Sequence, residues 1–295
     1  MLSCPIPAGG VTAGAPCCRL ASSLEPTRRA RRYPTDVTDA QRAVLDPLLP
    51  DPAWLAGRGG PREKHCRRLI VDAILYVVDN GIKWRALPAD FPPWPTVYKR
   101  FALWEKAGAT QRLLDGLRDR ARPAAGRVAA PSAAIVDSQS VRAAETVGKT
   151  TRGYDAGKKV NGRKRHIVVD TVGFLMAVLV TPASAQDRVA ARSLLRRMRD
   201  TAGGRVALVW ADGGYTGGLP DWARTTLGLV VQIVKRPELP CFTVLPRRWV
   251  VERTLCLDHR SPRCVRDYER LRHHHEAMVR WAMIRITSRR LMQPQ

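Results

Sequence analysis

The feature that most constrains the fold is a set of three carboxylates, each placed directly after a short apolar run. They are Asp137 after residues 133–136, Asp212 after residues 206–211, and Glu252 after residues 249–251. Short apolar runs that end at turn formers are typical of buried strands, so we expect Asp137 and Asp212 where strands leave a sheet. Residues 247–254 instead have the pattern of a helix start, which would lay Glu252 across the strand ends. Chemistry is often found at that edge of a sheet.

These three acids make chemical sense as one group. Three carboxylates that converge on one point repel one another unless protons or cations lie between them. Ligand sets made only of oxygen suit Mg²⁺ or Mn²⁺, and a pair of such ions is a common arrangement for phosphodiester cleavage. Taken singly, each acid is better explained as a helix cap or a surface carboxylate, so the prediction depends on Asp137, Asp212 and Glu252 together.

The chain also carries a large excess of positive charge. It has 50 Lys and Arg against 26 Asp and Glu, which gives a formal net charge of +24. Neutralising phosphates releases counterions, so a chain with this charge is expected to bind a polyanion such as DNA. High solubility alone is the competing explanation. No run approaches the roughly 18 apolar residues that a membrane span needs, so we expect a soluble protein with no membrane partner.

Neither the cysteines nor the histidines form a recognisable metal site. The seven cysteines are odd in number and include no Cys-x-x-Cys pair, which favours reduced thiols in a cytoplasmic protein. The run His273-His274-His275 has no Cys or His nearby at a spacing that completes a zinc site. We therefore interpret this run as a solvated, basic helix face.

The first part of the chain predicts a tail and then a small all-α domain. Residues 1–32 are rich in Pro, Gly, Ala, Ser and Cys, which is typical of a disordered tail. Residues 33–122 hold four expected helices: one capped by Thr38 and Gln41 and stopped at Pro50, one from Pro61 to Gly81, one over 97–106 after a Thr96 cap, and one over 111–120.

Short helices separated by Pro or Gly turns suit a helix-turn-helix-like domain. In that arrangement Tyr98, Lys99 and Arg100 would contact a groove of DNA. A helical bundle that serves only as a docking platform fits the pattern almost as well. Residues 123–132 are rich in Pro, Gly and Ala, and we interpret them as the linker to a second domain.

The second domain, residues 133–295, has the pattern of an α/β fold. Three strands are expected in succession, followed by alternating helices and strands and a closing helix. The expected strands cover 133–137, 164–170, 174–181, 206–211 and 229–234, with helices over 186–201 and 220–226. This order describes a mixed sheet with flanking helices, as in ribonuclease H-like folds.

Several motifs in order resemble those of bacterial insertion-sequence transposases of the DDE class, in the insertion-sequence-four and -five group. The resemblance spans about residues 33–291, and its motifs lie at 81–88, 94–104, 135–140, 153–166, 211–215 and 247–254. It implies a ribonuclease H-like catalytic domain that cuts and joins double-stranded DNA at the terminal inverted repeats of a mobile element. By motif position it makes Asp137, Asp212 and Glu252 the catalytic triad. These acids would hold two Mg²⁺ or Mn²⁺ ions that activate a water and later a DNA 3′-hydroxyl.

The resemblance also implies DNA contacts and partners. The glycine- and lysine-rich loop is expected to contact phosphates, with a mobile solvated hairpin as the alternative. The expected contacts are Lys158, Lys159, Arg163, Lys164 and Arg165 in this loop, and Arg247, Arg248 and Arg253 around Glu252. Two element ends must be held together, so we expect a homodimer on DNA in a nucleoid-associated protein. Gly148-Lys149-Thr150 lacks the rest of a phosphate loop, so no nucleotide cofactor is expected.

Residues 255–264 depart from the family pattern. Pro262 stands where a helix would continue, at a cost of about 3 kcal/mol or more, and the segment resembles a stretch translated out of register. We therefore expect a damaged helix around Glu252. Three functions stay open: a working transposase, a catalytically impaired transposase-derived protein that only binds DNA, and a nuclease that cuts without strand transfer.

Overall fold

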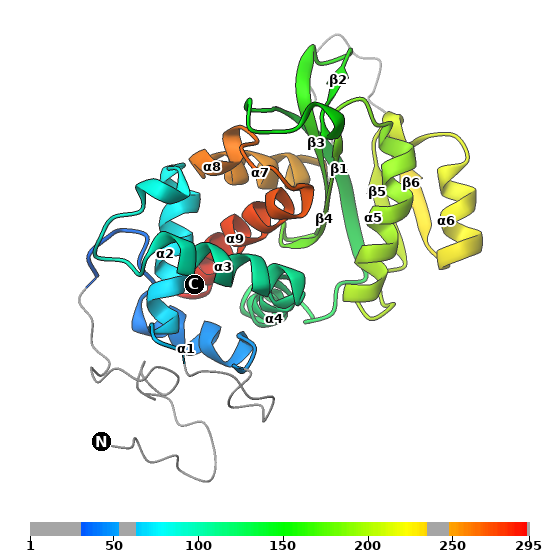
Figure 1. Cartoon of the computed structure of the whole chain (residues 1–295). Coiled ribbons are helices and arrows are strands. Elements are labelled where there is room, and N and C mark those ends of the chain that lie inside the picture. Colours follow the sequence, from blue (N-terminus) through cyan, green and yellow to red (C-terminus); the bar gives the residue numbers. More distant parts are fainter. Residues whose placement is uncertain (1–30, 53–62, 235–247, 294–295) are drawn as a thin grey trace.

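The computed structural model describes residues 31–52, 63–234 and 248–293. Within these ranges the chain forms a helical part and a six-stranded mixed sheet with helices on both faces (Figure 1). No helix in the described ranges is both long and apolar enough to cross a membrane. Among the described cysteines, Cys256 and Cys264 are free thiols, whereas Cys66 is disulfide-bonded, contrary to the prediction of reduced thiols throughout. Spacing along the chain cannot show which distant cysteines meet in the fold.

Four helices form the first part. They are α1 (Asp39–Leu45), α2 (Arg67–Asn80), α3 (Trp94–Lys106) and α4 (Ala109–Ala124). The predicted capping box at α1 is confirmed, because the Thr38 hydroxyl accepts from the Gln41 backbone and the Gln41 side chain accepts from the Thr38 backbone. The predicted end of α2 is also confirmed: Gly81 takes the left-handed conformation, with φ of 67°.

The helix starts and the linker differ from the prediction. Helix α2 begins at Arg67, and the expected start at Pro61 lies outside the described residues. Helix α3 begins at Trp94 instead of residue 97, because proline is well tolerated in the first turn, where Pro95 lies. Helix α4 continues through Pro123 into the expected linker. Pro123 lacks the N–H for a bond to the preceding turn, and the helix ends one residue later, at Ala124.

One apolar core joins the helical part to the sheet. The long helix α9 (Arg272–Leu291) lies between them, and its Trp281 ring packs 6.0 Å from the Trp104 ring of α3 (Figure 1). The same cluster of buried side chains includes Phe101 of α3, Ile284 of α9 and Ile135 of the sheet. A domain boundary between residues 122 and 133 stays a prediction, although buried side chains from both sides of it share one core.

The sheet has the ribonuclease H-like order. Its strands are β1 (Ala133–Arg142), β2 (Gly153–Asp155), β3 (Val160–Asp170), β4 (Leu175–Pro182), β5 (Leu208–Ala211) and β6 (Val230–Ile233). Strand β3 pairs antiparallel with β1 and with β4, while β5 is parallel to both β1 and β6. The predicted fold class is therefore confirmed. The short β2, which extends the sheet beside β3, was not predicted.

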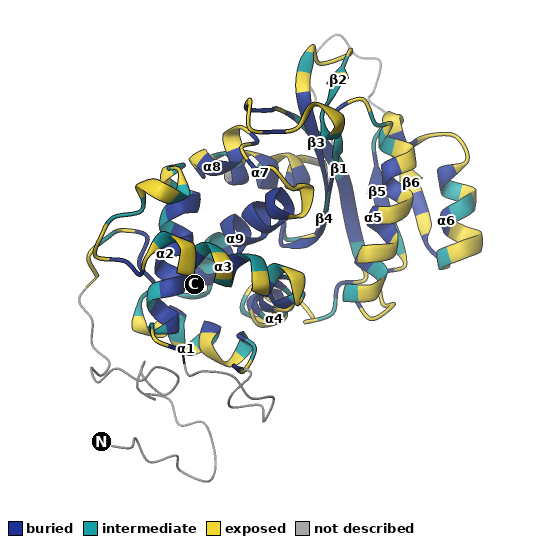
Figure 2. Cartoon of the chain, in the orientation of Figure 1, coloured by how far each residue is buried: buried dark blue, intermediate teal, exposed yellow. Residues whose placement is uncertain are grey.

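The two faces of the sheet are covered by different helices (Figure 1). Helices α5 (Asp187–Thr201) and α6 (Leu219–Leu227) cover one face, where Ala134 and Val136 of β1 are buried. Helices α7 (Arg248–His259), α8 (Pro262–Val265) and α9 cover the other, where Ile135 is buried. Side chains alternate between the faces of a strand, so neighbouring residues of β1 enter different cores. Figure 2 shows that the first half of β1, which lies between these helices, is mostly buried.

The expected break at Pro262 is confirmed, because α7 ends before it, but the expected damage to the helix around Glu252 is wrong. Helix α7 continues to His259, and Pro262 stands at the first position of α8, where its missing N–H has no hydrogen bond to lose. Leu255 and Cys264 are buried in the core shared with α9. The segment is therefore an integral part of this face of the sheet.

Candidate active site

Asp137 and Asp212 stand at matching places on neighbouring parallel strands. Ile135 of β1 pairs with Trp210 of β5, and each aspartate lies two residues further along its strand direction. Side chains two residues apart share a face, so Asp137 points to the face that Ile135 shares with α7 and α9. Both aspartates are half-buried. Asp212 directly follows β5, as predicted, whereas the prediction that Asp137 marks a strand end is wrong, because β1 continues to Arg142. The register nevertheless places the two acids beside each other where β5 ends.

Backbone amides orient both carboxylates. The Ser138 N–H donates to Asp137 Oδ1 at 2.7 Å, and the Gly214 N–H donates to Asp212 Oδ1 at 2.8 Å. A Cβ at residue 214 would lie only 3.1 Å from that Asp212 oxygen, so any larger residue would press on the carboxylate. The glycine at 214 therefore suits the close approach of the backbone to Asp212.

A buried tyrosine lies among three aspartates. Burial, followed by the negative charges of Asp137, Asp187 and Asp212, raises the pKa of Tyr215 well above its ordinary value. The phenol therefore stays neutral and retains its proton beside the acids. Tyr215 lies in the 211–215 motif, but the sequence alone assigned it no role. Asp187, the first residue of α5, belongs to no motif in the sequence.

A polar cavity of about 420 Å³ adjoins these groups. Its lining includes Tyr154, Asp155, Lys164, Ser184, Asp187 and Gly214. Lys164 Nζ lies 3.2 Å from Asp187 Oδ1 and 3.6 Å from Asp155 Oδ2. Beneath it, His166 Nδ1 lies 3.6 Å from Asp187 Oδ1, and burial lowers the pKa of His166 to about 4 despite that neighbouring charge. His166 is therefore a neutral imidazole at physiological pH.

Glu252 is on the exposed side of α7. The opposite side of this helix is buried against the sheet through Val251, Thr254 and Leu255. The Thr254 hydroxyl donates to the Gly173 carbonyl at 3.0 Å and so ties α7 to the turn between β3 and β4. Within the described ranges, no three His, Cys, Asp or Glu residues are grouped so that they could hold a metal ion. The strand register thus places Asp137 and Asp212 at neighbouring positions, and their joint role with Glu252 stays a prediction.

Three predicted phosphate contacts are engaged inside the fold. Arg163 and Arg165 are 0% exposed and pair with Asp267 at 2.9 Å and Asp258 at 2.5 Å. Lys164 is also buried, against the acids of the polar cavity. The prediction that Arg163 and Arg165 contact DNA is therefore wrong, because alternate cations along a strand can be neutralised by acids that are distant in sequence. A contact by Lys164, which lines the polar cavity, stays a prediction.

Two side chains that are predicted to contact phosphates are exposed on the hairpin between β2 and β3. Lys158 and Lys159 are exposed at its tip, so their contact with phosphates stays a prediction. The Lys158 ammonium donates to the Ser138 carbonyl at 3.3 Å, which brings the hairpin next to Asp137.

Two of the three α3 side chains that are predicted to contact DNA have partners within the protein. The Tyr98 ring packs 5.3 Å from Trp84, and its hydroxyl lies 3.2 Å from His274 Nδ1. Arg100 pairs with Glu63 at 2.8 Å, whereas Lys99 is exposed. These interactions give Tyr98 and Arg100 structural partners, and a groove contact by α3 stays a prediction.

The predicted contacts around Glu252 also stay predictions. Arg247 lies outside the described residues, and only the backbone of Arg248, the first residue of α7, is described. Arg253 donates to the Val172 carbonyl at 2.8 Å, with its guanidinium 4.7 Å from the centre of the Trp249 ring.

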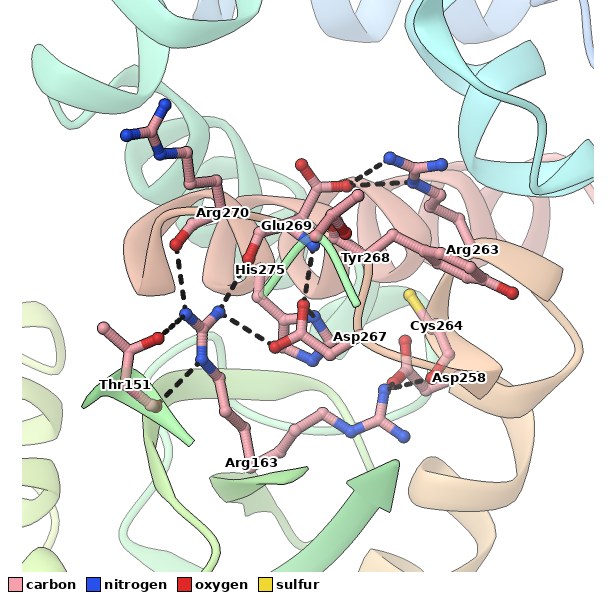
Figure 3. Close-up of polar contacts among 12 residues, drawn as sticks. Thr151, Arg163, Asp258, Arg263, Cys264, Asp267, Tyr268, Glu269, Arg270 and His275 are labelled. Carbon is pink, nitrogen blue, oxygen red and sulfur yellow. Dashed lines mark hydrogen bonds and ion pairs between the residues drawn. The ribbon is translucent and has the colours of Figure 1, made fainter. Parts of the chain in front are cut away.

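The histidine run is not the solvated face that the sequence suggested. His273 is exposed, but His274 and His275 are buried. His275 Nδ1 lies 3.1 Å from Asp267 Oδ1, in the polar network that also holds Arg163 (Figure 3). The first turn of α9 thus faces acids and aromatic rings from other elements, which spacing within the run could not reveal.

Comparisons with known proteins match two regions of the chain. Residues 37–114 match a family described as putative transposase of IS4/5 family, and residues 129–274 match a transposase DDE domain. The chain is also similar to an uncharacterized 16.2 kDa protein of insertion element IS402 from Burkholderia cepacia, with 33% identity over 109 residues. That stretch covers 36% of this chain and 73% of the relative. The DDE match contains Asp137, Asp212 and Glu252.

Proposed function

The chain belongs to the IS4/5 family of DDE transposases, and from this premise we propose that it cuts and joins DNA at the terminal inverted repeats of an insertion sequence. The main support is that Asp137 and Asp212 each lie two residues beyond the paired Ile135 and Trp210 of β1 and β5, inside the region that matches the DDE domain. The net charge of +24 supports a DNA substrate, since it supplies sequence-independent affinity for phosphates.

Domains of this class generally use divalent metal ions, and the residues present suit them. Mg²⁺ is commonly held by one or two carboxylates together with substrate phosphates, and Asp137 and Asp212 provide such a pair. Glu252 would complete the ligand set for two ions, Mg²⁺ or Mn²⁺. When bound, these ions would activate a water, and later a DNA 3′-hydroxyl, for in-line attack on phosphorus.

The surrounding residues would keep this pair of acids ready for use. Amides of Ser138 and Gly214 hold one oxygen of each aspartate, which reduces the freedom that metal binding would have to remove. The neutral Tyr215 phenol adds no negative charge beneath them. Lys158 and Lys159, exposed on the adjacent hairpin, would hold the DNA backbone near the scissile bond.

The two remaining functions fit less well or share the same site. A protein that only binds DNA is not favoured, because α7 is continuous through residues 255–259 and its sheet-facing side is packed. A nuclease without strand transfer would use the same acids and differ only in the joining step. Joining also requires two element ends in one complex, so we propose a homodimer on DNA.

Cleavage of a labelled duplex carrying the element's own terminal repeat tests the proposal. We expect cuts at the repeat boundary with Mg²⁺ or Mn²⁺, and their loss in EDTA and in Asp212→Asn. The matched control is Asp221→Asn, which removes a carboxylate that is 79% exposed on α6, and it should cut normally. Joining of the cut end to a second duplex separates a transposase from a nuclease. Repeat-specific binding with no cutting in any metal would contradict the proposal.

A further inference from the structure

Two arginines alternate along β3 in the core beneath α7, α8 and α9. Arg163 and Arg165 are both fully buried, and both pair with an aspartate. Arg163 reaches Asp267, and it also donates to the carbonyls of Glu269 and Arg270 at 2.9 and 3.1 Å (Figure 3). All of these partners lie in the segment between α8 and α9. Arg163 makes its remaining hydrogen bonds with Thr151.

Arg165 instead connects two elements that carry predicted catalytic acids. Its Nη1 donates to Asp258 Oδ2 at 2.5 Å and to the Cys264 carbonyl at 2.9 Å, and its Nη2 donates to Gln139 Oε1 at 2.6 Å. Gln139 is two residues beyond Asp137 on β1 and on the same face of the sheet. Asp258 is on α7, six residues beyond Glu252. A single guanidinium thus joins the strand of Asp137 to the helix of Glu252.

The shape of this side chain suits the task of fixing an orientation. A guanidinium is planar and presents its N–H groups in a rigid fork, so acceptors on three segments fix their mutual directions. Burying an ion pair brings little net stability, because desolvation offsets the attraction. Its more specific effect here is to set where the end of α7 lies relative to β1.

Arg165 and Thr254 hold α7 at different points. The Thr254 hydroxyl ties the middle of the helix to the turn at Gly173, and Arg165 ties its last turn to β1 and β3. Without the Arg165 contacts, the last turn of α7 would lose its polar link to β1 and β3, which would let the helix shift on its apolar packing about the Thr254 contact. Metal ligands must be held to within about 0.5 Å of their productive geometry, so a small tilt is enough to displace Glu252.

We propose that Arg165 is a positioning residue, which holds α7 in the orientation that lets Glu252 join Asp137 and Asp212 around the metal ions. This inference rests on the proposed function. Arg165 itself is fully buried, so it touches neither DNA nor metal. Its effect would pass through the angle between α7 and β1.

The test compares Arg165→Lys with Arg163→Lys in the full chain bound to its terminal-repeat duplex. Both variants keep the buried positive charge opposite an aspartate and lose the fork that contacts several acceptors. Mn²⁺ affinity is measured by isothermal titration calorimetry on the DNA complex, and folding by thermal unfolding. Loss of an indirect partner of a metal site typically weakens metal binding about 10- to 100-fold. We expect a loss of about 10-fold or more in Arg165→Lys and unchanged affinity in Arg163→Lys, with repeat binding in EDTA equal for both.

Three outcomes would overturn the inference. The first is an unchanged Mn²⁺ affinity in Arg165→Lys. The second is an equal loss in both variants, which would mean that any weakening of this core has the same effect. The third concerns an Arg165→Lys protein that does not fold. In that case the double variant Arg165→Gln with Asp258→Asn, which removes both charges, is tested instead, and the inference fails if this variant folds and binds Mn²⁺ normally. The two proposals fail separately, because a wild-type chain that binds Mn²⁺ but cuts no DNA contradicts only the proposed function.

Discussion

The two faces of the central sheet are covered in different ways, although the same strands supply both. The face under α5 and α6 is packed with apolar side chains such as Val136, Val168 and Leu194, and it becomes polar at the cavity near Lys164. The face under α7, α8 and α9 combines an apolar core with fully buried ion pairs at Arg163 and Arg165.

This difference shows that the positive charge of the chain serves two purposes. Cations on the hairpin tip remain exposed, and they are available to a polyanion. Cations a few residues further along β3 are neutralised inside the fold, where they join α7 and α9 to the sheet. A high net charge therefore predicts the partner of the chain better than it predicts which cations make the contact.

The largest expected effect comes from breaking the charged face at Asp267. Asp267→Ala removes the carboxylate shared by Arg163 and His275 and leaves a buried cation without it. Removing one partner of a buried pair typically costs about 3–5 kcal/mol, so unfolding in urea should show a loss of that size. The control Asp221→Ala, at an exposed site on α6, should change stability by less than about 0.5 kcal/mol. A loss below about 1 kcal/mol at Asp267 would show that this network does not hold the face together.

Breaking the apolar face should cost slightly less. Leu194→Ala leaves a cavity between α5 and the sheet, and comparable substitutions cost about 3 kcal/mol. Val189→Ala on the same helix, where the side chain is 61% exposed, is the control and should be nearly neutral. Urea unfolding of both variants measures the effect. Equal values for Leu194→Ala and Val189→Ala would mean that this face is not the tight apolar core described.

Local patterns predicted most of the fold, because each depends on neighbours in sequence. The capping box at Thr38, the glycine at 81 and five strands follow from short-range rules. The neighbouring positions of Asp137 and Asp212 were also within reach, since each acid follows an apolar run and a parallel register lays the two runs side by side. These elements would be expected in any chain with the same local sequence.

The roles of Arg163 and Arg165 depended on partners about one hundred residues away. Arg163 and Arg165 resemble solvent-facing cations until Asp267 and Asp258 are placed beside them. The burial of His275 depends on the same Asp267. Pro262 was misinterpreted for a related reason, because sequence alone does not show whether a proline interrupts one helix or begins the next.

Lowering the pH should destabilise the two faces of the sheet through different residues. On the α5 side, burial lowers the pKa of His166 to about 4, with Asp187 and Lys164 as the charged groups beside it. The unfolded chain takes up a proton below about pH 6.5 and the folded chain only near pH 4, so stability is full above pH 6.5 and falls between these values. The loss is about 3 kcal/mol at about 1.4 kcal/mol per pKa unit.

The variant His166→Gln should lack this loss between pH 6.5 and 4, whereas replacing the exposed His273 should leave it unchanged. Unfolding free energies measured below pH 4 should show a second loss of stability, which comes from Asp267 on the α7 side. Burial raises the pKa of Asp267, but His275 and Arg163 outweigh this effect and hold the pKa below its ordinary value, so protonation removes that stabilisation only in strong acid. Unfolding free energies at pH 7, 5 and 4 that decline equally in wild type and His166→Gln would contradict the assignment of the first loss.

The smallest effect should come from the exposed cations, and it concerns DNA affinity instead of stability. Lys158→Gln with Lys159→Gln removes two charges from the hairpin tip without disturbing a buried pair. Each lost phosphate contact reduces the slope of log K against log salt concentration by about 0.9, so the double variant should lower the slope by about 2. Lys106→Gln, at the exposed end of α3, measures the effect of net charge alone and should change the slope much less. If all three substitutions act equally per charge, the hairpin is no special DNA contact. The contrast between the exposed cations of the hairpin tip and the buried cations of β3 then has no bearing on where the DNA lies.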